Sequence, residues 1–176
     1  MPDWKYLYSE VFQVRYAIAA HYLRGCRNVI EIGGYKTPID GFLTHRYDSV
    51  LVVDPLVEPF QGKKVRRVAC DYRTFDFSPY SGANYGLALL GLDLPLSAAL
   101  FDLAAGAKTV VVEFSEDGCW KAGREGFQTL VGETGLRLRQ RIQLDLSGND
   151  FGDLTDSWPP RTNRFIYVLS PGDGGG

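Results

Sequence analysis

The chain has 176 residues and a formal net charge of -2, from 19 Lys and Arg against 21 Asp and Glu. This length suits one ordinary domain with a full hydrophobic core and excludes two large domains. The near balance of charge excludes a general electrostatic attraction to nucleic acid or to an anionic membrane surface, so we expect a small-molecule or protein partner.

The cysteines Cys26, Cys70 and Cys119 are widely spaced and form no C-x-x-C pair. We therefore expect no disulfide framework and no metal site. The N-terminus lacks the basic and then apolar run of a signal peptide, and Asp93 and Asp102 interrupt the longest apolar stretch. These features favour a soluble protein of a reducing compartment, located in the cytoplasm.

The first predicted element is a helix over residues 4–23, because its apolar residues recur at spacings of three and four before Gly25. Strands over 28–32 and 49–53 follow, with a turn and a short helix opened by Pro38 between them. The next predicted elements are strands 64–69 and 85–90, a helix 95–105, a strand 108–114 and a helix 122–133.

Strand alternation with one wet face begins at Leu136 and runs to Leu146, since leucine and isoleucine alternate there with charged and polar residues. The period breaks around Gln140, which predicts a β-bulge. A last strand is predicted over 164–169, and residues 171–176 form an expected disordered tail.

The order of elements is a helix, then alternating strands and helices, then two late strands joined without a helix. This order predicts an α/β fold with a doubly wound, mostly parallel, seven-stranded sheet that ends in an antiparallel hairpin. Residues 1–170 are expected to form a single domain, because no repeat or linker divides them.

Acidic residues lie at the ends of four of the predicted strands. In doubly wound sheets, ligands bind at the carboxyl ends of the strands, so these positions are candidate site residues. The candidates are Glu31 with Gly33 and Gly34, Asp54, Asp71 with Tyr72, and Gly91 with Asp93. Plainer interpretations stay open: Glu31 accepts backbone hydrogen bonds, Asp54-Pro55 forms a turn, and Asp71 caps the turn at Thr74 or pairs with Arg73.

These motifs resemble those of the class I S-adenosylmethionine-dependent methyltransferases. Val29-Ile30-Glu31-Ile32-Gly33 is similar to the start of the family's first motif. The resemblance implies that Glu31, Gly33, Gly34, Tyr35 and Gly91 contact S-adenosylmethionine and that Asp54 holds its ribose. It further implies that Asp71 takes the adenine amino group while Tyr72, beside it, covers the ring. The closing hairpin is also typical of this family.

The implied function is transfer of the methyl group to a small-molecule acceptor. If the acceptor is a hydroxyl or an amine, Asp93 and His45 are the first candidates for proton removal, although His45 also suits a polar surface. The absence of G-x-G-x-x-G disfavours a dinucleotide-dependent dehydrogenase.

The loop Gly33-Gly34-Tyr35-Lys36-Thr37 holds less glycine than the resembled family usually has. This departure leaves an alternative, a non-catalytic binding or assembly module with the same fold. The aromatic residues Trp120, Phe151 and Trp158 are compatible with an interface to a protein partner or a second copy.

Overall fold

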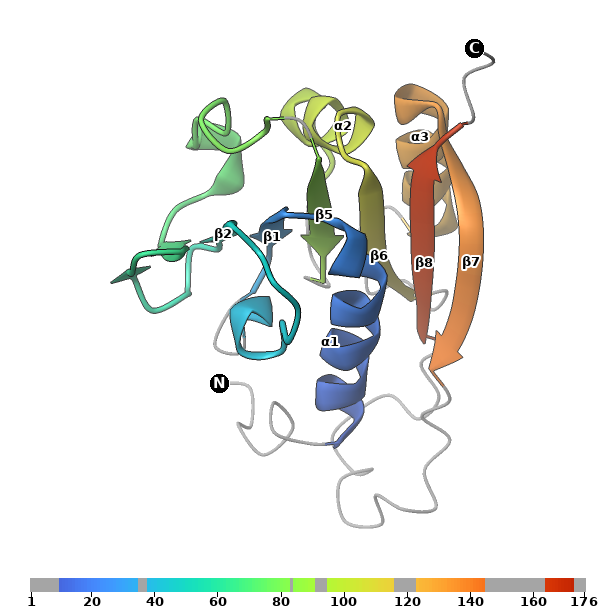
Figure 1. The fold of residues 1–176 in the computed structure, drawn as a ribbon. Coiled ribbons are helices and arrows are strands. Elements are labelled where there is room, and N and C mark those ends of the chain that lie inside the picture. Colours follow the sequence, from blue (N-terminus) through green and yellow to red (C-terminus); the bar gives the residue numbers. More distant parts are fainter. Residues whose placement is uncertain are drawn as a thin grey trace, which may run out of the picture.

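The computed structural model describes residues 10–34, 38–82, 84–90, 95–115, 123–144 and 164–172. Within these residues, eight strands form one sheet in the order β3-β4-β2-β1-β5-β6-β8-β7 (Figure 1). The strands are β1 (Asn28–Ile32), β2 (Ser49–Val53), β3 (Phe60–Gln61), β4 (Val65–Val68), β5 (Tyr85–Leu89), β6 (Thr109–Ser115), β7 (Leu136–Leu144) and β8 (Arg164–Pro171).

The centre of the sheet is parallel and its two edges are antiparallel. β1 pairs in parallel with both β2 and β5, and the parallel pairing continues to β4 on one side and to β6 on the other. β8 runs antiparallel to both β6 and β7, and β3 runs antiparallel to β4. The mostly parallel sheet with a closing antiparallel pair is therefore confirmed.

Helices cover both faces of the sheet, as a doubly wound fold requires. The helical elements are α1 (Glu10–Tyr22), η2 (Leu23–Gly25), η3 (Ile39–Gly41), η4 (Tyr72–Thr74), α2 (Ala98–Ala105) and α3 (Gly123–Thr134), with η marking 3₁₀ turns. α1, η2 and η3 bury side chains against one face, and α1 crosses that face in Figure 1. α2 and α3 pack against the other face.

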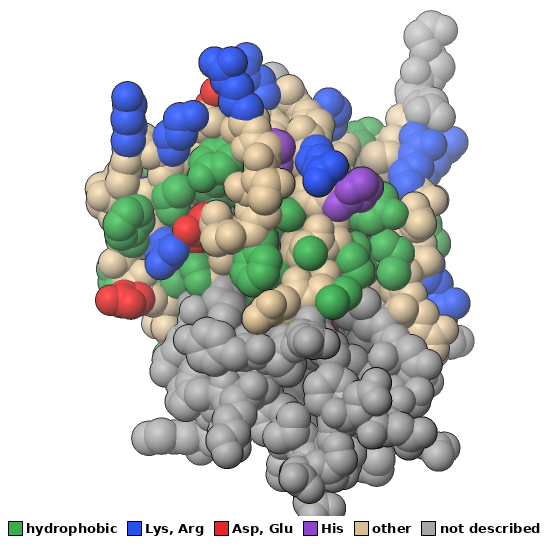
Figure 2. All heavy atoms as spheres, turned by 60° about the horizontal axis from the view of Figure 1, so that its bottom comes forward, with side chains coloured by type: hydrophobic (Ala, Val, Ile, Leu, Met, Phe, Trp, Pro, Cys, Tyr) green, Lys and Arg blue, Asp and Glu red, His purple; other side chains and the backbone are tan. Residues whose placement is uncertain are grey.

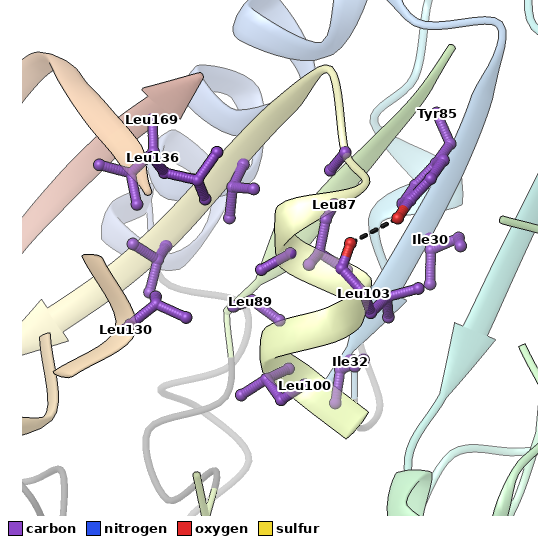
Figure 3. Close-up of a cluster of buried hydrophobic side chains, with 14 of the residues drawn as sticks. Ile30, Ile32, Tyr85, Leu87, Leu89, Leu100, Leu103, Leu130, Leu136 and Leu169 are labelled. Carbon is purple, nitrogen blue, oxygen red and sulfur yellow. Dashed lines mark hydrogen bonds between the residues drawn. The ribbon is translucent and has the colours of Figure 1, made fainter. Parts of the chain in front are cut away.

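The core under α2 shows why these strands are continuous apolar runs. Leu100 and Leu103 of α2 pack on β1 and β5, in a cluster that includes Ile30 and Leu87 (Figure 3). At one side of this cluster the Tyr85 hydroxyl donates to the carbonyl oxygen of Leu103 at 2.5 Å. A strand covered on both faces has no position for a solvated side chain, so it loses the alternation of a half-exposed strand.

Local signals explain two element ends. Ser97 accepts the Leu100 N–H at 3.3 Å and caps α2, so this helix begins at Ala98 rather than at the predicted Pro95. Gly135 adopts a φ of 64° directly after α3, a left-handed conformation that turns the chain into β7.

The structure differs from the predicted elements in three places. The sheet has an eighth strand, β3, in a segment where no element was predicted, and only the short η4 separates β4 from β5, so strands and helices do not alternate strictly there. β8 extends to Pro171, which pairs with Leu136, so the strand includes the first residue of the predicted tail. The predicted bulge is confirmed by a register shift between Leu138 and Gln140.

Parts of the predicted helices over 4–23 and 122–133, and most of the tail, lie outside the described residues. No helix in the described ranges combines the length and the apolar character needed to cross a membrane.

Candidate functional site

The strand order reverses between β1 and β5. From β1 the chain moves outward to β2 and β4, then returns to β5 on the other side of β1 and continues to β6. The parallel strands end at one edge of the sheet, so Gly33, Asp54 and Asp71, which follow β1, β2 and β4, all lie along it. We call this edge of the sheet the carboxyl edge. Ligands of doubly wound folds bind there, at the point where the strand order reverses.

The turn after β1 requires both glycines, for different reasons. Gly33 has a φ of 90°, which side chains rarely allow, and its N–H donates to the Val53 carbonyl at 3.1 Å. A Cβ atom on Gly34 would lie 2.6 Å from Glu31 Oε2 and 2.6 Å from Val52 Cγ1. Gly34 therefore leaves the space that the Glu31 carboxyl occupies. Tyr35 lies outside the described residues.

Glu31 is a fully buried carboxyl on β1. Its Oε2 accepts the Ile39 N–H of η3 at 2.7 Å, and its Oε1 has no hydrogen-bond partner within the described ranges. Burial raises the pKa of Glu31 to about 8, because the charged form loses its hydration. At neutral pH the side chain therefore holds its proton and presents an unused polar atom.

Two ion pairs lie near Glu31. Arg15 of α1 donates to Glu113 of β6 at 2.5 Å, with both side chains buried. Arg67 of β4 donates to both carboxylate oxygens of Asp40 at 2.6 and 3.0 Å. Each guanidinium group near Glu31 is thus engaged by a different carboxylate.

Neither ion pair was among the predicted site residues. One signal was available, because Glu113 directly follows the apolar run Val110–Val112 of a buried strand. A charged residue within such a run requires a partner.

Asp54 directly follows β2 at the carboxyl edge and is partly exposed. Its Oδ1 accepts the Leu56 N–H at 2.7 Å, which closes a turn, and its own N–H donates to the Val68 carbonyl at 3.2 Å. In the described part of the chain, Oδ2 has no hydrogen-bond partner. The predicted turn is present, and the second carboxylate oxygen remains able to accept from a ligand.

Asp71 is engaged by its own neighbours. Its carboxylate accepts the backbone N–H of Arg73 at 2.9 Å and pairs with the Arg73 guanidinium. Hydrogen bonds from Arg73 lower the pKa of Asp71 to about 2. The Thr74 hydroxyl donates to the Asp71 carbonyl at 2.8 Å. This is the cap and ion pair that the plainer interpretation of Asp71 described.

Tyr72 lies in the core rather than on the surface of the edge, with 4% of its area exposed. Its hydroxyl donates to the Pro95 carbonyl and lies 3.1 Å from Ser97 Oγ, so it joins η4 to the start of α2. Burial raises the pKa of the hydroxyl. In this structure Tyr72 positions the chain before α2.

The structure does not bring His45 to the carboxyl edge. Its Nε2 lies 3.3 Å from the carbonyl oxygen of Cys26, which precedes β1, so the ring sits at the amino end of the sheet. Proton removal by His45 at the carboxyl edge has no geometric support. Asp93 and Gly91 lie outside the described residues.

An apolar groove of about 370 Å³ lies elsewhere, between α1 and β7. It is lined by Val14, Ala17, Ile18, His21, Tyr22 and Ile142. In Figure 2, hydrophobic side chains gather on the face of the molecule that is turned toward the viewer. The lining holds no carboxylate, so this groove does not share the chemistry of the carboxyl edge.

Comparison with known proteins gives structural relatives only. No protein-family model and no curated protein matches the sequence. Similar solved structures include the N-methyltransferase NodS from Bradyrhizobium japonicum WM9 in complex with S-adenosyl-L-homocysteine, at a TM-score of 0.62 and 11% identity, covering 96% of this chain and 91% of that one. They also include a 1,6-didemethyltoxoflavin-N1-methyltransferase from Burkholderia thailandensis, at a TM-score of 0.60 and 16% identity, covering 96% and 81%.

A third similar structure is the magnesium protoporphyrin IX methyltransferase of Synechocystis PCC 6803 with bound S-adenosylmethionine. Its TM-score is 0.57 at 11% identity, covering 91% of this chain and 79% of that one. The chain has the class I methyltransferase-like fold. At these identities the likeness concerns the fold, and the chemistry of the chain depends on the residues of its own carboxyl edge.

Proposed function

We propose that the protein binds S-adenosylmethionine at the carboxyl edge and transfers its methyl group to a small-molecule acceptor. The observation that carries the proposal is the buried Glu31, which has an unpartnered oxygen beside the Gly33 turn at the point where the strand order reverses. Support comes from the similar structures, because NodS holds S-adenosyl-L-homocysteine and the Synechocystis enzyme holds S-adenosylmethionine.

The residues of the edge offer acceptors for two parts of this cofactor. Glu31 Oε1 and Asp54 Oδ2 are acceptors without partners among the described residues, and they suit an ammonium group and ribose hydroxyls. Gly33 and Gly34 would form the surrounding backbone, and Tyr35 and Gly91, which lie outside the described residues, stay predicted contacts. Asp71 fits less directly, because it would have to exchange Arg73 for the adenine amino group.

The cofactor would supply an already electrophilic methyl group on its sulfonium. The chain therefore has to hold the acceptor in line with that methyl group and to exclude water. A hydroxyl or amine acceptor must also lose a proton, and Asp93 is our candidate for that step because it follows β5. If turnover persists in Asp93→Ala, Asp93 has no such role.

Isothermal titration with S-adenosylmethionine and S-adenosylhomocysteine tests the binding proposal. We expect micromolar affinity that falls about tenfold or more in Asp54→Ala and in Asp54→Asn, since either change removes the Oδ2 acceptor. Asn keeps an oxygen for the Leu56 N–H, so its loss of affinity cannot be attributed to the turn. Asp48→Asn, at the exposed Arg27 ion pair before β2, is the matched control and should bind normally.

The alternative is a non-catalytic binding or assembly module with the same fold. The observation that favours it is the Asp71 carboxylate, already held by Arg73. Absence of binding of both ligands at millimolar concentration would reject the methyltransferase proposal and leave this alternative. Binding with measurable methyl transfer to an acceptor would reject the alternative.

A further inference from the structure

The edge of the sheet opposite the carboxyl edge concentrates positive charge. We call it the amino edge, because the parallel strands begin there. The segments directly before β1, β2, β4 and β6 are residues 24–27, 44–48, 62–64 and 106–108, and they contain six exposed cations and one acid. The cations are Arg24, Arg27, Arg46, Lys63, Lys64 and Lys108, and the acid is Asp48.

Hydrogen bonds between the segments make the amino edge one surface. The Lys108 ammonium donates to the Gly25 carbonyl at 3.0 Å, and the Lys64 ammonium donates to the Tyr47 carbonyl at 2.7 Å. In the sheet order, β4 and β6 are separated by β2, β1 and β5, so about 19 Å lies between them at about 4.8 Å per strand spacing. The six cations therefore form a row along this edge.

Structural roles account for only part of this row. The two lysines that contact backbone carbonyls hold their loops, and Arg27 pairs with Asp48 at 2.8 Å. Arg24, Arg46 and Lys63 differ, because their exposed side chains form no hydrogen bond or ion pair with any described residue. An interpretation in which each cation stabilises its own loop leaves these three without a role.

Few acids offset the row. Asp102 and Glu133 are exposed in the last turns of α2 and α3, and neither forms an ion pair with another described residue. The net charge of -2 is a sum over the whole chain, so it conceals this local excess of positive charge. A polyanion can therefore bind at the amino edge although the whole chain lacks a general attraction to one.

The form of the row favours a linear polyanion. Interfaces between folded proteins depend on apolar anchors, and none of the large exposed apolar side chains of the described residues belongs to these four segments. A single line of charges also matches a strand of anionic groups better than a plane of lipid headgroups. The guanidinium groups of Arg24 and Arg46 suit phosphate, whose oxygens accept two parallel hydrogen bonds.

We propose that the amino edge binds the phosphate backbone of a nucleic acid strand. The binding is independent of base sequence, because phosphate contacts carry no sequence information. β1 and β2 have five residues each, so the amino edge lies about 16 Å from the carboxyl edge. The two edges can be occupied at the same time, and this inference does not rest on the proposed function.

Fluorescence anisotropy with a labelled single-stranded DNA of 20 nucleotides and mixed sequence tests the proposal. We expect a Kd in the micromolar range at 50 mM salt. The logarithm of the binding constant should fall with the logarithm of the salt concentration with a slope of about -3, since each of four or five phosphate contacts contributes about -0.7.

The decisive variant is Arg24→Gln/Arg46→Gln/Lys63→Gln, which removes the three cations without a described partner. We expect the salt slope to weaken by about 2 and the affinity at 50 mM salt to fall about tenfold or more. Arg24→Lys/Arg46→Lys/Lys63→Arg keeps the charges and should bind like the native protein. Far-ultraviolet circular dichroism checks that both variants are folded.

A single substitution tests the position of the charge. Arg46→Gln should weaken the salt slope by about 0.7. Arg141→Gln makes the same change of net charge near the carboxyl end of β7, away from the amino edge, and should leave the slope unchanged.

Three results would overturn the proposal. The first is no binding of the oligonucleotide at 50 mM salt, and the second is an unchanged affinity and slope in the folded triple glutamine variant. The third is tighter binding of polyglutamate, or of vesicles that contain phosphatidylserine, than of the oligonucleotide. That result would assign the row to an acidic polypeptide or to a membrane surface instead.

Discussion

The buried carboxyl of Glu31 makes the stability of the ligand-free protein depend on pH. Its pKa is raised from 4.5 to about 8, so between these values the folded state keeps a proton that the unfolded state loses. Stability contributed by this group therefore falls as pH rises through that window, by up to about 1.4 kcal/mol per pH unit.

Glu31→Gln should remove this dependence, because the amide is neutral at every pH. We expect urea unfolding to show similar stabilities for the variant and the native protein near pH 5. At pH 8 the variant should be more stable, by a few kcal/mol. Parallel stability curves across this range would mean that Glu31 ionises normally in the folded protein.

Gly34 allows a test of the space beside Glu31. Gly34→Ala places a Cβ atom 2.6 Å from Glu31 Oε2 and from Val52 Cγ1, so we expect a loss of about 1–3 kcal/mol in chemical denaturation. Gly41→Ala is the matched control, because no atom lies within 4 Å of its added Cβ. Equal effects of the two substitutions would show that the turn after β1 adapts without strain.

The buried Arg15–Glu113 ion pair joins α1 to β6. Removing either partner alone leaves a buried charge, so Arg15→Met and Glu113→Gln should each lower the free energy of unfolding by about 3–5 kcal/mol. The exposed Arg27–Asp48 pair is the control, and Arg27→Met should change the free energy of unfolding by less than about 1 kcal/mol. Urea denaturation measures both, and a small effect at Arg15 would mean that α1 is held by apolar contacts alone.

Elements with strong local patterns were predicted well. β1 and β2 begin and end at the predicted residues, because each is an apolar run bounded by turn residues, and the bulge near Gln140 follows from its broken alternation. β3 was missed because two exposed residues carry no pattern. Strand ends alone were enough to place Gly33 and Asp54 at one edge.

The contacts of the site depended on long-range packing. Glu31 Oε2 accepts the Ile39 N–H, and Oε1 has no partner among the described residues, because of where α1 and η3 pack. No local sequence pattern encodes this packing. The position of His45 was different, because the segment before a parallel strand must lie at that strand's amino end. His45 shortly precedes Ser49, the first residue of β2, so its distance from the carboxyl edge follows from the sequence.

At the scale of the whole molecule, the two faces of one sheet contribute to two hydrophobic cores. Val29 packs in the core under α1, while the next residue, Ile30, packs in the core under α2. Val111 and Val112 of β6 divide between the two cores in the same way. Neither face can lose its packing without disturbing strands that the other face needs, so the sheet should unfold as one cooperative unit.

This coupling predicts a single unfolding transition, as expected for one domain over residues 1–170. Leu23 of η2 lies in the core under α1, and Leu103 of α2 lies in the other core. Leu23→Ala and Leu103→Ala should each lower the free energy of unfolding by about 2–5 kcal/mol. For each variant, far-ultraviolet circular dichroism and aromatic fluorescence should report the same midpoint, because both faces depend on the same strands. Two separated transitions, or a variant that shifts only one probe, would mean that the two cores unfold independently.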